Sequence, residues 1–143
     1  MIEPSNHGYS VFVSKMINGI LHFIVQLKFE CGLIDLIELG PTLQTSYLIS
    51  SKNFADLPFS KYVTNLSEHN VIFDSLQSEE GGRFFKEQNR NMIILTNDQI
   101  DISSYDNYVW MTLNQLNSFI KFTNLVNIQA RNLVAQTRLV DVK

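Results

Sequence analysis

The sequence predicts an α+β domain, because strand-like segments come first along the chain and helix-like segments come last. Apolar and polar residues alternate at period two in the N-terminal segments, whereas apolar residues recur at helical spacing after residue 112. With 143 residues, the chain is long enough for one substantial core. We find no linker or internal repeat that divides it, so we expect a single domain over residues 1–143.

The first predicted elements are two strands joined by a tight turn. In the run 20–29, the odd-numbered residues after Ile20 are all apolar and share one face, while His22 lies on the other face. Asn18-Gly19 is typical of a two-residue hairpin turn and precedes this run. It therefore predicts a hairpin to a shorter apolar strand over residues 11–17.

The middle of the chain alternates between turns and strands. Three further strands are predicted, over residues 33–39, 71–76 and 92–96. The first of them begins after a turn at Cys31-Gly32 and ends before Gly40-Pro41. Residues 45–69 are polar and have no sustained period, which indicates a loop with one irregular helix. A polar turn over 77–83 and one or two helical turns over 84–89 are expected between the last two strands.

The end of the chain predicts two helices. Thr112 and Gln115 have the spacing of a capping box. Four apolar residues of this helix share one face, namely Leu113, Leu116, Phe119 and Ile120. Asn124 is a candidate cap for a last helix with its own apolar stripe.

Composition and missing motifs exclude several function classes. The net charge of −3 gives no reason to expect nucleic acid or an anionic membrane as a partner. Cys31 is the only cysteine, and no apolar run reaches membrane-spanning length, so we expect a soluble, cytoplasmic protein. The sequence contains no glycine-rich dinucleotide motif, Walker loop or metal-spaced His and Cys cluster. We therefore expect neither a cofactor nor a metal.

The densest polar segment lies between residues 77 and 91. Arg83 and Arg90 have the planar, bidentate donors that suit a pyrophosphate. Glu79 or Glu80 is a candidate general base, particularly if repulsion between the two carboxylates raises one pKa. The alternative is a solvated hairpin turn with surface ion pairs, and composition alone favours that alternative.

Two further candidates come from the predicted sheet. His22 is a possible proton carrier, because histidine is the side chain that changes charge near neutral pH, but a histidine in an apolar strand is more often a hydrogen-bonded core residue. Gln44 is a possible hydrogen-bonding group for a sugar, or equally a polar residue at a sheet edge.

The C-terminal region adds an aromatic and a polar cluster. Trp110 can stack on a nucleobase, although an aromatic cluster before a helix is more often core. Asn124, Asn127 and Arg131 have spacings of three and four residues, which would place them on one helical face. Such a face can contact a phosphate or a neighbouring subunit.

Four collinear blocks of this sequence resemble the nucleotide-sugar 2,3-dehydratases. The blocks are residues 18–26 (NGILHFIVQ), 38–44 (ELGPTLQ), 74–84 with 89–92 (DSLQSEEGGRF and NRNM), and 110–116 with 124–127 and 130–131 (WMTLNQL, NLVN and AR). The resemblance implies an enzyme, a lyase that removes water from an NDP-4-keto-6-deoxyhexose. One local departure is Glu30-Cys31-Gly32, where the family usually has Glu-Pro-Gly.

The resemblance also implies a fold and a partner. The expected fold is Nudix-like, with a mixed sheet and C-terminal helices. The Arg-Glu-x-x-Glu-Glu helix that binds Mg²⁺ in Nudix hydrolases is missing here, so pyrophosphate hydrolysis is not expected. Family members carry two repeats, and this chain covers most of one. We therefore expect a homodimer or a second repeat chain as partner, and a partner-dependent or inactive nucleotide-sugar-binding half-domain is the alternative.

The matched positions suggest roles for a dTDP-linked 4-keto-6-deoxyhexose as substrate. Glu79 or Glu80 would be the base, with His22 as the alternative. The substrate-binding set would be Arg83, Arg90 and Arg131 on the diphosphate, Gln44 and Gln77 on the hexose and Trp110 on the nucleobase, together with Asn89, Asn124 and Asn127.

Overall fold

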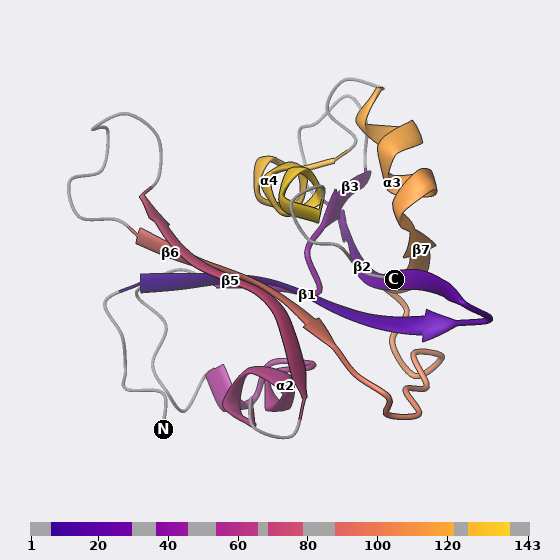
Figure 1. The fold of residues 1–143 in the computed structure, drawn as a ribbon, viewed down its shortest axis with the longest axis horizontal. Helices are drawn as coiled ribbons and strands as arrows, with labels where there is room; N and C mark the ends of the chain where they lie inside the picture. The colour runs from indigo at the N-terminus through magenta and orange to yellow at the C-terminus, as the bar shows by residue number, and fades with distance from the viewer. Residues whose placement is uncertain are drawn as a thin grey trace.

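The computed structural model describes residues 7–29, 37–45, 54–65, 69–78, 88–121 and 126–137. Its strands form one seven-stranded sheet (Figure 1). The strands are β1 (His7–Ile17), β2 (Ile20–Phe29), β3 (Ile37–Gly40), β4 (Leu43–Thr45), β5 (Asn70–Ser78), β6 (Gln88–Leu95) and β7 (Tyr108–Thr112). The helices are α2 (Lys61–Thr64), α3 (Leu113–Ile120) and α4 (Ile128–Thr137).

β1 is the central strand of the sheet. It pairs antiparallel with β2 and β4 and parallel with β6. β5 pairs with β6, while β3 and β7 both pair with β2. The sheet is therefore mixed, and the helices α3 and α4 follow it in the chain, which confirms the predicted α+β class.

The predicted hairpin between the first two strands is confirmed. Asn18 and Gly19 have φ angles of 53° and 78°, which is the left-handed backbone that a type I′ turn requires. The turn fixes the register from Ile17 opposite Ile20 onward. Phe23 then faces one side of the sheet and the next residue of β2 faces the other, as the period of two predicts.

The sheet carries an apolar core on each face, and Figure 1 shows α2 on one side of the sheet and α4 on the other. The first core consists of Tyr9, Val11, Val13, Ile24, Leu43, Phe54, Phe59, Tyr62, Val63, Met92, Ile94 and Tyr108. The second core consists of Phe12, Phe23, Val25, Leu39, Ile93, Met111, Leu116, Val126, Ala130, Leu133 and Val134. Consecutive residues of β1 alternate between these two cores, so both faces of the strand are buried.

The predicted helical turns over 84–89 are wrong at their C-terminal end. Gln88 and Asn89 belong to β6, where they pair with His7 and Gly8 of β1. Strand pairing on both sides of β6 overrides the local sequence preference there. Residues 84–87 lie outside the described residues.

Other predicted boundaries change as well. The strand predicted over 33–39 is confirmed from Ile37 onward but includes Gly40, and its earlier residues and the Cys31-Gly32 turn lie outside the described residues. The strand predicted over 71–76 extends to Asn70–Ser78. β4 and β7 were not predicted, because they are short and gain their hydrogen bonds from β1 and β2.

The two C-terminal helices form, but one cap differs from the prediction. Thr112 and Gln115 make the predicted capping box, in which each side chain accepts the other's backbone N–H. α4 begins at Ile128, and the Ala130 N–H donates to Asn127 Oδ1 at 2.8 Å. Asn127 therefore caps this helix in place of Asn124, which lies outside the described residues.

Thr42 joins the two long strands inside the protein. Its hydroxyl accepts a hydrogen bond from the Val13 N–H at 2.9 Å and donates one to the Ile24 carbonyl at 2.5 Å. The Thr42 side chain has no exposed surface. It thereby satisfies backbone groups that would otherwise be buried without a partner.

We expect Thr42→Val to lower the free energy of unfolding by about 1–3 kcal/mol, the cost of leaving a buried backbone group unpaired. Urea denaturation measures the change. Thr64→Val is the matched control, because the Thr64 hydroxyl is exposed and bonds only within its own helical turn. Equal stability of the two variants would contradict a structural role for the Thr42 hydroxyl.

Candidate functional site

A polar row crosses the sheet at one end of its longest strand. Gln44 of β4 pairs with Ser10 of β1, Ser10 pairs with Asn91 of β6, and Asn91 pairs with Ser75 of β5. Two positions further along β1 and β6, the same face carries Phe12 and Ile93, which belong to the second core. We call Gln44, Ser10, Asn91 and Ser75 the polar row, and it lies on the face that α4 covers.

Gln44 of the polar row makes two side-chain hydrogen bonds. Its Oε1 accepts hydrogen bonds from Lys28 Nζ at 2.6 Å and from Asn127 Nδ2 at 2.9 Å. These contacts join β2, β4 and the start of α4, which are far apart in sequence. Two of the predicted substrate-binding residues, Gln44 and Asn127, are thus in direct contact.

Asn127 is held at this position by its own backbone. Its N–H donates to the Leu39 carbonyl at 2.9 Å, and Val126 beside it forms a parallel bridge to Leu39. Asn127 is buried, with 6% of its surface exposed. The N-terminus of α4 is thereby attached to β3, next to the polar row.

Arg131 lies one turn into α4, on the helix that covers the polar row. Its Nε donates to the Val126 carbonyl at 2.9 Å, and its side chain is half-buried. This bond uses one of the five N–H donors of the guanidinium and leaves the terminal nitrogens. A donor fork held in this way suits an anionic ligand.

Arg90 lies on the opposite face of the sheet. It pairs with Tyr9, which belongs to the first core, and it makes a bidentate ion pair with Asp74 at 2.8 and 2.5 Å. The hydrogen bonds that Arg90 donates to Asp74 raise the pKa of Arg90 above its ordinary value, although partial burial opposes that shift. The sheet therefore separates Arg90 from Gln44, although the sequence suggested that both contact one substrate.

His22 lies away from the polar row. It pairs with Lys15, five residues along β1 from Ser10, the partner of Gln44. That offset corresponds to about 16 Å along a strand. His22 Nδ1 is 2.8 Å from the carbonyl of Ile20, so this nitrogen carries the proton when the ring is neutral.

The remaining predicted residues are described only in part. Trp110 of β7 pairs with Ile24 and packs half-buried against the first core. The backbones of Gln77 and Asn89 pair with each other, so the polar segment flanks the junction of β5 and β6. Glu79, Glu80, Arg83 and Asn124 lie outside the described residues.

Sequence reasoning gave no role to four residues of this region. They are Lys28, Asp74, Ser10 and Asn91. Lys28 had a signal, because it is a cation on the otherwise mostly apolar strand 20–29. The sequence carried no signal for the ion pair of Arg90 with Asp74, because sixteen residues separate them and only the strand register brings them together.

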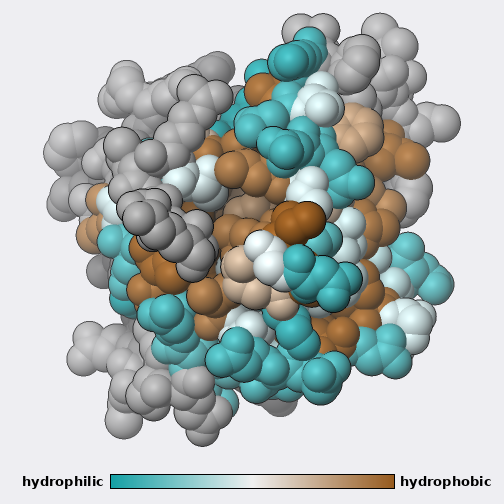
Figure 2. Space-filling view, turned by 45° about the vertical axis from the view of Figure 1, so that its right-hand side comes forward, coloured by the Kyte–Doolittle hydropathy of each residue, from teal (hydrophilic) through white to brown (hydrophobic). Residues whose placement is uncertain are grey.

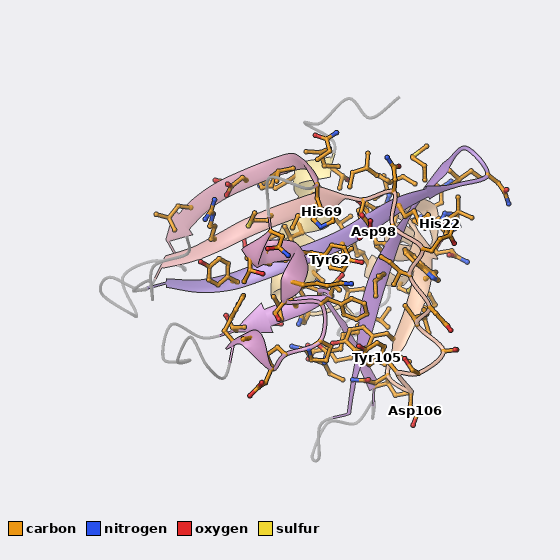
Figure 3. All side chains as sticks on the ribbon, turned by 90° about the horizontal axis from the view of Figure 1, so that it is seen from below. His22, Tyr62, His69, Asp98, Tyr105 and Asp106 are labelled. Carbon is orange, nitrogen blue, oxygen red and sulfur yellow. The ribbon has the colours of Figure 1, made fainter. Side chains whose placement is uncertain are left out.

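A separate hollow of about 490 Å³ lies on the first-core side, between residues 55–62 and 99–105. Tyr62 is one of its lining residues and contacts His69 and Asp98, and Figure 3 shows these three side chains in one region. Burial, and secondarily Asp98, raises the pKa of Tyr62 to about 12. Among the predicted site residues that the structure describes, none lines this hollow.

The part of the chain that the structure describes contains neither a metal-binding cluster nor a membrane-spanning helix. Within those residues, no three His, Cys, Asp or Glu side chains gather where they could hold a metal ion. None of the described helices is long and apolar enough to cross a membrane.

The fold is that of the Nudix class. A Nudix hydrolase from M. smegmatis, RenU, has a TM-score of 0.53 over 94% of this chain and 83% of its own, at 8% sequence identity. The C-terminal domain of mouse MUTYH, solved in complex with human PCNA, also has a TM-score of 0.53, at 6% identity over 92% of this chain and 86% of that one. At such identities the likeness concerns the fold alone, and it confirms the predicted Nudix-like sheet.

The sequence places the chain more narrowly. The family model of the NDP-hexose 2,3-dehydratases matches residues 1–137, and the chain belongs to that family. Similar curated relatives are two dTDP-4-dehydro-6-deoxy-α-D-glucopyranose 2,3-dehydratases. That of Streptomyces violaceoruber is 37% identical over 96% of this chain, and that of Saccharopolyspora spinosa is 38% identical over 94%. The chain spans only 31% and 28% of their respective lengths.

The buried tyrosines predict how the protein responds to alkali. Burial also raises the pKa of Tyr108 to about 12, so Tyr62 and Tyr108 should ionise well after an ordinary tyrosine of pKa about 10. The folded state retains these protons where the unfolded state loses them. Their contribution to stability is therefore complete below pH 10 and is lost as the pH rises toward 12.

A spectrophotometric titration at 295 nm measures this directly. Tyr62 and Tyr108 should contribute a late phase near pH 12, and Tyr62→Phe should remove half of the contribution of this pair. Absence of a late phase, or a late phase that Tyr62→Phe leaves unchanged, in a protein that is still folded would contradict the burial of the Tyr62 hydroxyl.

Proposed function

We propose that this chain supplies a nucleotide-sugar site to a dehydratase that eliminates water across C2 and C3 of an NDP-4-keto-6-deoxyhexose. Its membership of the family supports the reaction class. The observation that carries the proposal is the contact of Gln44 with Asn127 and Lys28 beside the polar row. Gln44 and Asn127 belong to two of the blocks that resemble the family, and these residues, 83 positions apart in the sequence, are in direct contact.

The elimination needs a base, an acid and a group that stabilises negative charge. The C3 hydrogen of the substrate is acidic, because the C4 carbonyl stabilises the enolate. The base removes that proton, the C2–O bond breaks as a double bond forms between C2 and C3, and the acid protonates the departing hydroxyl to water. The resulting enol tautomerises to a 3,4-diketo sugar. Each proton transfer contributes roughly 10²–10⁴-fold, and this chemistry makes the enzyme a lyase.

We assign the base to Glu79 or Glu80 in preference to His22. Both glutamates belong to the segment between Ser78 and Gln88, and these two residues pair with each other. Gln88 also pairs with His7, at the end of β1 where the polar row lies. His22 pairs further along β1, about 16 Å from the level of Gln44, which is longer than a hexose.

The positions of the arginines favour Arg131 as a contact for the diphosphate. Arg131 lies on the helix above the polar row, and its terminal nitrogens are not used by its bond to Val126. Arg90 is on the other face and already holds a carboxylate. In this proposal Gln44 contacts the nucleotide-sugar beside Arg131, while Arg90 supports β5 and β6.

We further propose that the working enzyme contains a second repeat or a second copy of this chain. The chain spans about three tenths of its curated relatives. Figure 2 shows apolar side chains gathered in the middle of one face with hydrophilic residues below them. Ile20 and Leu76 are also more than half exposed, and an apolar surface with a polar border is typical of an assembly contact.

A second candidate follows from the same lengths. The chain can act as a partner-dependent half-domain that binds a nucleotide-sugar without turnover. The small share of the relatives that it spans favours this candidate over independent catalysis. Measured turnover by this chain alone would exclude it.

We expect dTDP and dTDP-4-keto-6-deoxyglucose to raise the melting temperature of the chain. A ligand that binds the folded state stabilises it by about 2.7 kcal/mol at a concentration a hundred times its Kd. Arg131→Gln should weaken dTDP binding about tenfold, which is the loss of one charge-assisted hydrogen bond. Thermal-shift titration measures both effects.

Two variants serve as controls for that titration. Lys121→Gln removes a charge at an exposed position after α3 and should leave the binding unchanged. Arg90→Gln tests the opposite face of the sheet. A greater loss of dTDP affinity in Arg90→Gln than in Arg131→Gln would indicate that the diphosphate binds on the face of Arg90. Absence of any shift in a cooperatively folding chain would refute the proposed site.

The assignment of the base is tested in an assembly that turns over. We expect Glu79→Gln or Glu80→Gln to lower kcat by about 10²-fold or more, because general-base catalysis contributes at least that much. His22→Gln should retain most of the activity. Water-elimination assays with each purified variant give the comparison. Full turnover by both glutamine variants would show that neither carboxylate is the general base.

A further inference from the structure

We infer that Lys28 and Asn127 orient the Gln44 carboxamide so that its nitrogen, and not its oxygen, meets the ligand. Gln44 would then act only as a hydrogen-bond donor, to an oxygen of the nucleotide-sugar. The inference rests on the proposed function, and it adds the direction of one hydrogen bond and two positioning residues.

The orientation begins at the start of α4. The backbone N–H of Ala130 donates to one end of the Asn127 side chain at 2.8 Å. A backbone N–H has no acceptor capacity, so the atom that it meets must be the amide oxygen. The other end of the Asn127 side chain is therefore the NH₂ group, which can only donate.

That NH₂ group then orients Gln44. Asn127 Nδ2 meets the Gln44 amide at 2.9 Å, and Lys28 Nζ meets the same atom at 2.6 Å. An ammonium is also a donor without an acceptor. Both neighbours require an oxygen at this point, so a flipped Gln44 would place its NH₂ group against two donors and lose two hydrogen bonds.

The packing around this contact keeps it in place. A Cβ added to Gly40 would lie 2.9 Å from Lys28 Cε and 3.1 Å from Asn127 Nδ2, so only a glycine leaves both side chains where they are. Asn127 is buried, and Lys28 and Gln44 are half-buried. The fold thus leaves space for both positioning residues beside Gly40.

The geometry leaves one polar group of Gln44 without a hydrogen-bond partner among the described residues. Within the part of the chain that the structure describes, Nε2 has no hydrogen-bond acceptor, while Oε1 already accepts two bonds. Gln44 is half-buried, and we infer that Nε2 is its group that meets a ligand. The matching ligand group is an acceptor oxygen, which a diphosphate and a keto-hexose both provide.

The first experiment tests the orientation without any ligand. In a ¹⁵N-glutamine-labelled sample, the Gln44 side-chain NH₂ signal is identified by its loss in Gln44→Glu. We expect this NH₂ group to exchange rapidly with water, because it has no acceptor, and to become protected when dTDP or dTDP-4-keto-6-deoxyglucose is added. Protection in the free protein would overturn the inference whatever the protein binds.

The second experiment tests the positioning residues by calorimetric titration. Asn127→Asp keeps an acceptor for Ala130 but replaces the donor to Gln44, so it should turn the Gln44 amide and weaken binding about tenfold, the equivalent of one hydrogen bond. Lys28→Met should weaken binding as well, whereas Lys28→Arg retains a donor and should restore it. Melting temperatures show that each variant is folded.

The ligands and variants separate the possible outcomes. A loss with both dTDP and the sugar nucleotide assigns the bond to the diphosphate, and a loss with the sugar nucleotide alone assigns it to the hexose. Full affinity in both Asn127→Asp and Lys28→Met, with binding by the unsubstituted chain intact, overturns this inference and leaves the proposed function standing. Absence of binding by the unsubstituted chain overturns the proposed function and this inference together.

Discussion

The pairing of β1 on both sides is the constraint on which the rest of the structure depends. β1 lies parallel to β6 along one edge, and β2 and β4 share its other edge. A strand buried in this way sends alternate residues into opposite cores, so both faces need a cover. Residues 54–63 cover one face and α4 the other. The same register places Gln44 and Asn91 on either side of Ser10, which sets the position of the polar row.

Polar side chains connect the covering elements to this sheet. Thr42 spans Val13 and Ile24, and Asn127 connects α4 to β3 and Gln44. In the buried interior, each of these bonds avoids the cost of an unpaired polar group, so the bonded arrangement is strongly preferred to its alternatives. A ligand therefore meets groups whose directions are fixed before it arrives. That preorganisation lowers the entropy that binding would otherwise cost.

Local patterns predicted the elements whose signals lie within a few residues. The Asn18-Gly19 turn and the capping box of Thr112 are examples, because their conformations and bonds are decided by neighbours in the sequence. β7 and the start of β6 were missed, since their strand character comes from partners far along the chain. The same limit applies to the site. Resemblance identified Gln44, but its bond to Lys28 and the pairing of Arg90 with Asp74 depend on the sheet register.

The composition of the polar row limits what this part of the chain can contribute to an elimination. Amide and hydroxyl side chains, such as those of Gln44 and Ser10, donate and accept hydrogen bonds but do not change protonation near neutral pH. The row can hold and orient a sugar nucleotide, and a donor aimed at a developing oxyanion also stabilises charge. Removal of the C3 proton needs a titratable group. In the proposed mechanism that group comes from Glu79 or Glu80, or from a second repeat, so binding and proton transfer belong to different segments of the assembled enzyme.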